Sequence, residues 1–155
     1  MRSFGIEFLL AFVFISAGGC GRAPSASIAP PASDVAPLVL LSVTSDATED
    51  PQAVDMALKL AGFSLDEGRH VVLFFNVRGV KNPSHALADD FAFEQDEPIK
   101  QQLADLIERG VDVHVCPICM KALGVAESDL MEGAQVTTRA GLFSNIRSDT
   151  AVLTY

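Results

Sequence analysis

The chain has 155 residues, of which 49% are hydrophobic and 20% are charged, and its formal net charge is −9. This length and hydrophobic content suit one folded domain with a substantial core. The acidic balance argues against nucleic acid as a partner. Three cysteines are too few for a secreted scaffold that is held together by several disulfides.

The first residues have the features of a secretion signal. Arg2 supplies a positive charge, residues 8–15 form an apolar run, and small residues lead up to Cys20. The run is short for a bilayer span, which favours a signal peptide over residues 1–19. Small residues before a cysteine resemble the lipobox of bacterial lipoproteins. That resemblance implies cleavage before Cys20, a lipid on its sulfur, and a membrane-anchored protein of the bacterial cell envelope that faces the periplasm. An ordinary signal peptide with a spare cysteine and an uncleaved tether are the alternatives.

A linker is predicted between this signal and the folded part. Residues 20–37 are rich in proline, alanine and serine and have no apolar periodicity. Such a composition is typical of a flexible, extended segment. The linker therefore separates a lipidated Cys20 from a folded domain over residues 38–155.

The folded part alternates apolar runs with amphipathic patterns. Strands are predicted at 38–43, 70–77, 111–115, 134–138 and 151–155, and helices from Pro51 to Gly68, from Pro98 to Gly110, and from Pro117 to Gly124. Short helical segments are expected near Leu130–Met131 and Leu142–Ile146. The near-continuous apolar run at 38–43 indicates a strand that is covered on both faces, as in parallel sheets. The sequence thus predicts an α/β domain with a mostly parallel sheet of about five strands flanked by helices.

The long connection at 78–96 is expected to be functional or to make a contact. It has a net acidic composition and contains two aromatic rings, Phe91 and Phe93. These rings are predicted to pack on the domain's own core, on a neighbouring subunit or on a partner.

The motif Cys116-Pro117-Ile118-Cys119 joins the third predicted strand to the following helix. Proline favours the first position of a helix, so Cys116 is predicted to be the N-cap and Cys119 to lie in the first turn. The free amides and the positive helix end favour a thiolate at Cys116 and make it a better nucleophile. A C-x-x-C pair at this junction favours redox, sulfur or metal chemistry over an inert buried pair.

Polar residues follow the first two predicted strands. Sites in open α/β sheets lie outside the carboxyl ends of the strands, which places Ser45, Asn76 and Arg78 with Cys116. Arg78 and Lys121 are candidates for adding positive charge near the thiolate. For these polar residues, capping and solvation are the alternative roles.

The sequence resembles the DsrE/DsrF-like family of small α/β sulfur-handling proteins. The resemblance lies in residues 44–51, 68–80, 113–124 and 152–155. It implies a DsrE-like fold over residues 38–155, a persulfide on Cys116, and homo-oligomers that are trimers or hexamers. No cofactor is expected.

Four functions stay open. The first is a sulfur carrier or sulfurtransferase that holds a persulfide on Cys116, with Cys119 as a possible resolving thiol and a sulfur donor or acceptor as partner. The second is a thiol–disulfide redox protein with an envelope partner, which would need Cys119 absolutely. The third is a soft-metal protein that binds copper or zinc. The fourth is a non-catalytic envelope protein. In the third function, the metal ligands would be His114, Cys116, Cys119 and Met120.

Overall fold

A computed structural model describes residues 36–144 and 146–155 of the chain. The predicted signal peptide at 1–19, Cys20 and the predicted linker up to residue 35 lie outside the described residues. Within the described ranges, every helix is too short or too polar to cross a bilayer.

The domain is built on one sheet of five parallel strands in the order β4-β3-β2-β1-β5. This arrangement confirms the predicted α/β fold with a parallel sheet, in which β1 lies between β5 and β2. The strands are β1 (Leu38–Val43), β2 (His70–Phe75), β3 (Asp112–Val115), β4 (Ala134–Val136) and β5 (Ala151–Thr154).

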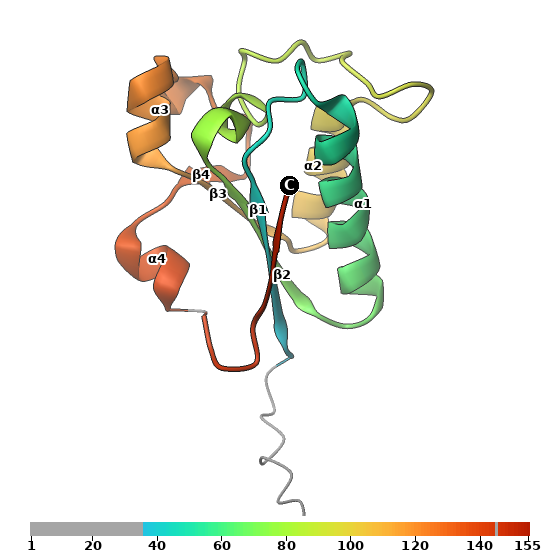
Figure 1. Cartoon of the computed structure of the whole chain (residues 1–155), viewed down its shortest axis with the longest axis vertical. Helices are drawn as coiled ribbons and strands as arrows, with labels where there is room; N and C mark the ends of the chain where they lie inside the picture. The colour runs from blue at the N-terminus through green and yellow to red at the C-terminus, as the bar shows by residue number, and fades with distance from the viewer. Residues whose placement is uncertain (1–35, 145) are drawn as a thin grey trace, which may run out of the picture. The chain divides into compact units, whose positions relative to one another are not determined.

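Two long helices cover one face of the sheet (Figure 1). Helix α1 (Pro51–Asp66) begins where the Asp50 side chain accepts a hydrogen bond from the Ala53 N–H at 3.1 Å, and Pro51 takes the first position, as predicted. Helix α2 (Ile99–Glu108) packs beside it. Alternate strand residues point into this layer and form the main core with the two helices. The strand members of that core are Val39, Leu41, Val43, Val71, Leu73, Phe75, Val113 and Val115.

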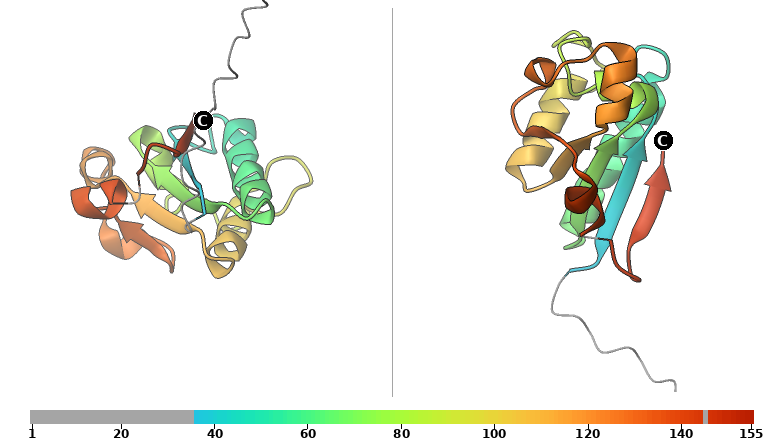
Figure 2. Two further views of the ribbon diagram at one scale, coloured as in Figure 1. Left: turned by 90° about the horizontal axis from the view of Figure 1, so that it is seen from below. Right: turned by 90° about the vertical axis from the view of Figure 1, so that its left-hand side faces the viewer.

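The short helix α4 (Arg139–Phe143) lies on the opposite side of the sheet from α1 and α2 (Figure 1). Its Leu142 packs against a small buried cluster that includes Leu38 and Leu40. The chain moves across the sheet in one direction from β1 to β4 and then returns to β5 beside β1. Because crossovers between parallel strands are right-handed, this reversal places α4 on the opposite face from α1. The right-hand view of Figure 2 shows β5 as the outermost strand beside β1.

Several predicted boundaries were wrong by one or two residues. Strand β2 was predicted to run to residue 77 but ends at Phe75, because a 3-10 helix, η1 (Val77–Lys81), begins there. Strand β3 begins at Asp112, β4 ends at Val136 and β5 ends at Thr154. The turn predicted near Leu130–Met131 is the 3-10 helix η2 (Glu127–Asp129), and the last short helix is α4, which ends before residue 146.

Part of the connection at 78–96 packs against the domain itself. Its first residues belong to η1, and Phe91 packs against the main core. The Phe91 carbonyl also accepts a hydrogen bond from the Ile99 N–H at 2.9 Å. One of the two predicted aromatic contacts is therefore made within the chain.

Candidate active site at the carboxyl edge of the sheet

The cysteine pair sits where β3 passes into α3 (Pro117–Leu123). Cys116 is the N-cap residue with extended backbone angles, and Pro117 occupies the first helical position, which confirms the predicted start of this helix. The Cys116 N–H donates to the carbonyl of Phe75 at 2.9 Å. This bond ties the first cysteine to the end of β2. Gly124 ends the helix with a left-handed backbone at φ 71°.

Cys119 contacts the segment that follows β2. The backbone N–H of Val77 donates to the Cys119 Sγ at 3.1 Å. Cys116 and Cys119 are both free thiols and both are half-buried. The structure thus brings the two sulfurs to one edge of the sheet, with a backbone amide aimed at the second of them.

The surroundings of Cys119 favour its protonated form. Burial raises the pKa of the Cys119 thiol, and a hydrogen bond with the Cys116 side chain raises it further. The hydrogen bond from Val77 lowers the pKa but does not outweigh the other two effects. Cys119 therefore keeps its proton at neutral pH and can donate it to a neighbouring sulfur.

The Val77 amide is held in place by an unusual backbone. Val77 has φ 49°, a left-handed conformation that is strained for a β-branched residue. Two residues later, a Cβ on Gly79 would overlap the carbonyl oxygen of Val43. The Gly79 N–H donates to the carbonyl of Thr44 at 3.0 Å. Glycine at this position thus lets η1 lie directly on the end of β1, and this close approach fixes the direction of the Val77 N–H.

Two hollows share Val77 and Arg78 as lining residues. The first has a volume of about 290 Å³ and contains Cys119, with otherwise mainly apolar walls. The second has a volume of about 550 Å³ and is polar. The walls of the first are Val77, Arg78, Cys119, Ala122 and Leu123. The walls of the second are Thr44, Ser45, Asp46, Glu49, Asp50, Val77 and Arg78.

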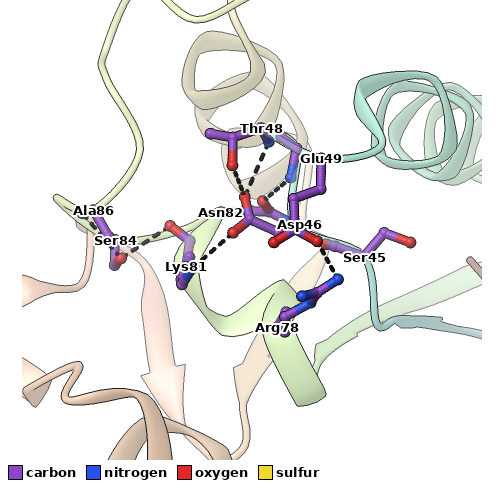
Figure 3. A network of polar contacts seen from close by, with 10 residues as sticks. Ser45, Asp46, Thr48, Glu49, Arg78, Lys81, Asn82, Ser84 and Ala86 are labelled. Carbon is purple, nitrogen blue, oxygen red and sulfur yellow. Dashed lines mark hydrogen bonds and ion pairs between the residues drawn. The ribbon is translucent and has the colours of Figure 1, made fainter.

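Three charged residues that line the polar hollow, Asp46, Glu49 and Arg78, form ion pairs, as Figure 3 shows. Arg78 forms an ion pair with Glu49, and the Lys81 Nζ lies 2.9 Å from Asp46 Oδ2. Burial acts to raise the pKa of Asp46, but hydrogen bonds from Lys81 and Thr48 outweigh it and hold the pKa below its ordinary value. Asp46 is therefore a fixed, neutralised anion in the wall of the hollow.

The predicted binding residues separate into two groups. Ser45 and Arg78 line the polar hollow, and Arg78 also borders the hollow of Cys119. Asn76 instead bridges strands, because its Nδ2 donates to the Ser42 Oγ at 2.8 Å. Lys121 is exposed in the last turn of α3. Arg78 is thus the predicted cation that borders the hollow of Cys119.

The proposed metal ligands do not converge. Met120 packs into the main core. His114 is buried with no partner for its Nδ1 among the described residues, and α4 packs near it through Gly141. Burial lowers the pKa of His114 against the opposing charge of Asp112, so the ring is neutral at pH 7. In the part of the chain that the structure describes, no three His, Cys, Asp or Glu side chains are grouped to hold a metal ion.

Two residues of the site were missed from the sequence. Val77 supplies the amide that faces Cys119, and Glu49 supplies the partner of Arg78. Gly79 directly after Asn76-Val77-Arg78 was the available signal, because a glycine just past a strand often marks a tight approach of the backbone. No feature of the sequence predicts that Glu49 forms an ion pair with Arg78.

Known proteins share this fold and sequence pattern. The profile of the DsrE/DsrF-like family matches residues 39–155. The uncharacterized protein MJ0989 of Methanocaldococcus jannaschii is 32% identical over 105 residues, which cover 64% of this chain and 83% of the relative.

Two solved structures share the fold. The ychN protein from E. coli superposes with a TM-score of 0.62 at 20% identity and covers 78% of this chain and 100% of its own. MTH1491 from Methanobacterium thermoautotrophicum superposes with a TM-score of 0.52 at 17% identity. The superposition covers 76% of this chain and 97% of MTH1491. At these identities the two structures support the fold alone.

Proposed function

Since the chain belongs to the DsrE/DsrF-like family, we propose that it is a sulfur carrier that holds a persulfide on Cys116. The observation that supports this most directly is the pair of free thiols at the carboxyl edge of the sheet, where the Val77 N–H is aimed at Cys119. Family membership indicates sulfur chemistry, and the cysteine pair provides the sulfur atoms for it.

The transfer step needs only the donor and one thiolate. The Cys116 thiolate attacks the outer sulfur of a donor persulfide R–S–SH, and a new S–S bond forms as the donor S–S bond breaks. The leaving group is R–S⁻, which takes the electron pair of the broken bond. Cys116 then carries –S–SH, and the reverse step on an acceptor thiolate returns the sulfur.

Cys119 determines how long the persulfide lasts. As a thiolate it would attack the Cys116 Sγ, release sulfide and leave a disulfide. Its raised pKa keeps it protonated at neutral pH and slows that reaction. A protonated Cys119 also offers a hydrogen bond to the persulfide. These properties favour storage and delivery of sulfur over its release as sulfide.

Thiol–disulfide exchange is the second candidate function. Two free thiols on the first turn of α3 are close enough to interact, and a C-x-x-C pair is a common redox arrangement. A Cys119→Ser variant separates the candidates. A carrier keeps its ability to accept sulfur in this variant, whereas a redox protein loses its activity.

Intact-mass measurement after treatment with polysulfide tests the proposal. We expect an adduct of about 32 Da that maps to Cys116, present in the Cys119→Ser variant and absent in Cys116→Ser. A wild-type protein that forms only a Cys116–Cys119 disulfide under this treatment would contradict sulfur carriage and support the redox function.

We also infer that this chemistry takes place at the bacterial envelope. The support is the sequence of residues 1–20, where an apolar run and small residues precede Cys20. A lipid on Cys20 would tether the domain to the membrane, facing the periplasm, where it would exchange sulfur with a donor or acceptor protein. Metabolic labelling with a fatty acid tests this, since the label is expected in the wild type and not in Cys20→Ser.

A further inference from the structure

We propose that the sulfur donor is a low-molecular-weight persulfide with an α-amino-acid group, and that the polar hollow binds this group while the donor's sulfur lies beside the cysteine pair. This inference rests on the proposed sulfur-carrier function and adds the class of substrate. The feature that supports it is that Val77 and Arg78 line both hollows.

The size and position of the hollows suit a small ligand. Pockets for small molecules have volumes of about 300–1,000 Å³, and the polar hollow has about 550 Å³. The hollow of Cys119, which also has Val77 and Arg78 among its walls, adds about 290 Å³. A ligand that occupies both has a polar group at one end and a soft, weakly hydrated sulfur at the other.

The charges in the polar hollow match a zwitterion. Asp46 is neutralised by Lys81, and the Asp50 side chain is occupied as the N-cap of α1. Arg78 and Glu49 remain, and their side chains are 54% and 45% exposed. A guanidinium binds a carboxylate in a two-point geometry, and a carboxylate binds an ammonium. An α-amino-acid group offers both partners and can replace the exposed Arg78–Glu49 ion pair, which itself contributes little stability.

This binding mode brings the donor's reacting bond to the site. With its amino-acid group beside Arg78, the donor places the outer sulfur of R–S–SH in the hollow of Cys119. Cys116 lines neither hollow, but its side chain is hydrogen-bonded to Cys119, so its thiolate is close enough to attack that sulfur and expel R–S⁻. The expelled thiolate leaves as the free amino-acid thiol, so no oxidant or reductant is consumed. Holding donor and nucleophile together raises the transfer rate.

The experiment compares donors across matched variants of the full chain. The donors are cysteine hydropersulfide, the persulfide of 3-mercaptopropionate, which lacks the ammonium group, the persulfide of cysteamine, which lacks the carboxylate, and inorganic polysulfide. The test variants are Arg78→Gln and Glu49→Gln. Arg109→Gln is the control, because Arg109 forms a comparable exposed ion pair with Asp66 outside both hollows.

We expect cysteine hydropersulfide to react at least about tenfold faster than either truncated donor. Arg78→Gln is expected to slow its transfer about tenfold and to change the rate with inorganic polysulfide less than about threefold. Arg109→Gln should behave as the wild type. Equal transfer rates for all three organic persulfides would overturn the proposal. So would an Arg78→Gln variant that loses as much transfer rate with inorganic polysulfide as with cysteine hydropersulfide. If the wild type accepts sulfur from none of the donors, the sulfur-carrier function itself fails.

Binding of an unreactive analogue gives a second readout. S-methyl-L-cysteine has the amino-acid group but cannot transfer sulfur. Calorimetry is expected to detect its binding to the wild type and to Arg109→Gln, and weaker binding to Arg78→Gln and Glu49→Gln. Binding that is equal in all four proteins, or absent from the wild type, would contradict the assigned hollow independently of any persulfide chemistry.

Discussion

At position 79 the carbonyl oxygen of Val43 leaves no room for a side chain. Gly79→Ala is therefore expected to push η1 away from β1 and to lower the free energy of unfolding by about 1–3 kcal/mol. The displacement should also move the Val77 N–H away from Cys119 and slow sulfur transfer. Urea unfolding and the transfer assay measure the two effects.

Gly62→Ala is the matched control. A Cβ at Gly62 would meet side-chain atoms of Arg109 and Leu106 at 3.6 and 3.9 Å, which are ordinary contacts. Since Gly62 lies in α1, alanine there is expected to add up to about 1 kcal/mol of stability through helix propensity. Equal stability losses in the two variants would show that the close approach at Gly79 is not decisive.

The thiol of Cys119 gives a prediction on pH. Because its pKa is raised, the thiolate fraction at neutral pH is small, and alkylation of Cys119 should accelerate with pH up to a midpoint above that of a free cysteine. Cys116→Ala removes one cause of the raised pKa, so the midpoint should fall while burial keeps it above the ordinary value. Peptide mapping after timed alkylation measures it. A midpoint at or below that of free cysteine would contradict the assigned state of Cys119.

At the scale of elements, α3 presents both thiols and depends on its caps. Pro117 begins the helix and Gly124 ends it in the left-handed conformation, with open space around the position of a Cβ. Gly124→Ala is therefore expected to cost about 1–2 kcal/mol through backbone conformation alone. Gly124→Asn should cost less, because asparagine tolerates this conformation. Thermal unfolding of both variants tests this. An equal loss in both would point to packing instead of backbone conformation.

For the whole molecule, the unequal cover of the two sheet faces predicts self-association. Phe143 of α4 and Val152 of β5 are 62% and 58% exposed, on the side of the sheet opposite the long helices α1 and α2. We expect copies of the chain to associate through this surface, because exposed apolar side chains next to an edge strand favour association. Val152→Glu should shift sedimentation toward the monomer.

Phe63 provides the control for this prediction. It is 59% exposed on α1, which covers the other face of the sheet. Phe63→Glu is expected to leave the sedimentation unchanged. If Phe63→Glu dissociates the assembly and Val152→Glu does not, the contact lies on the helical face and the assignment is wrong.

The fold and the placement of the cysteines could be predicted because they depend on local patterns. Apolar runs such as residues 38–43 mark buried parallel strands, and Pro117 and Gly124 set the ends of α3. Sites in open α/β sheets lie at the carboxyl ends of the strands, and this regularity then predicted that Ser45, Arg78 and Cys116 lie at one edge. Each of these inferences uses residues that are close in the sequence or a regularity of parallel sheets.

The residue pattern alone gives the position of the cysteine pair, because the C-x-x-C spacing and the cap residues act over a single turn of helix. The surroundings of the two sulfurs depend instead on long-range contacts of the folded chain. A left-handed Val77 has no signature in residue type, since its strain is sustained by the contact of Gly79 with β1. The pairing of Arg78 with Glu49 likewise depends on which charges the folded chain brings within reach. Long-range packing therefore supplies the amide beside Cys119 and the charges of the polar hollow.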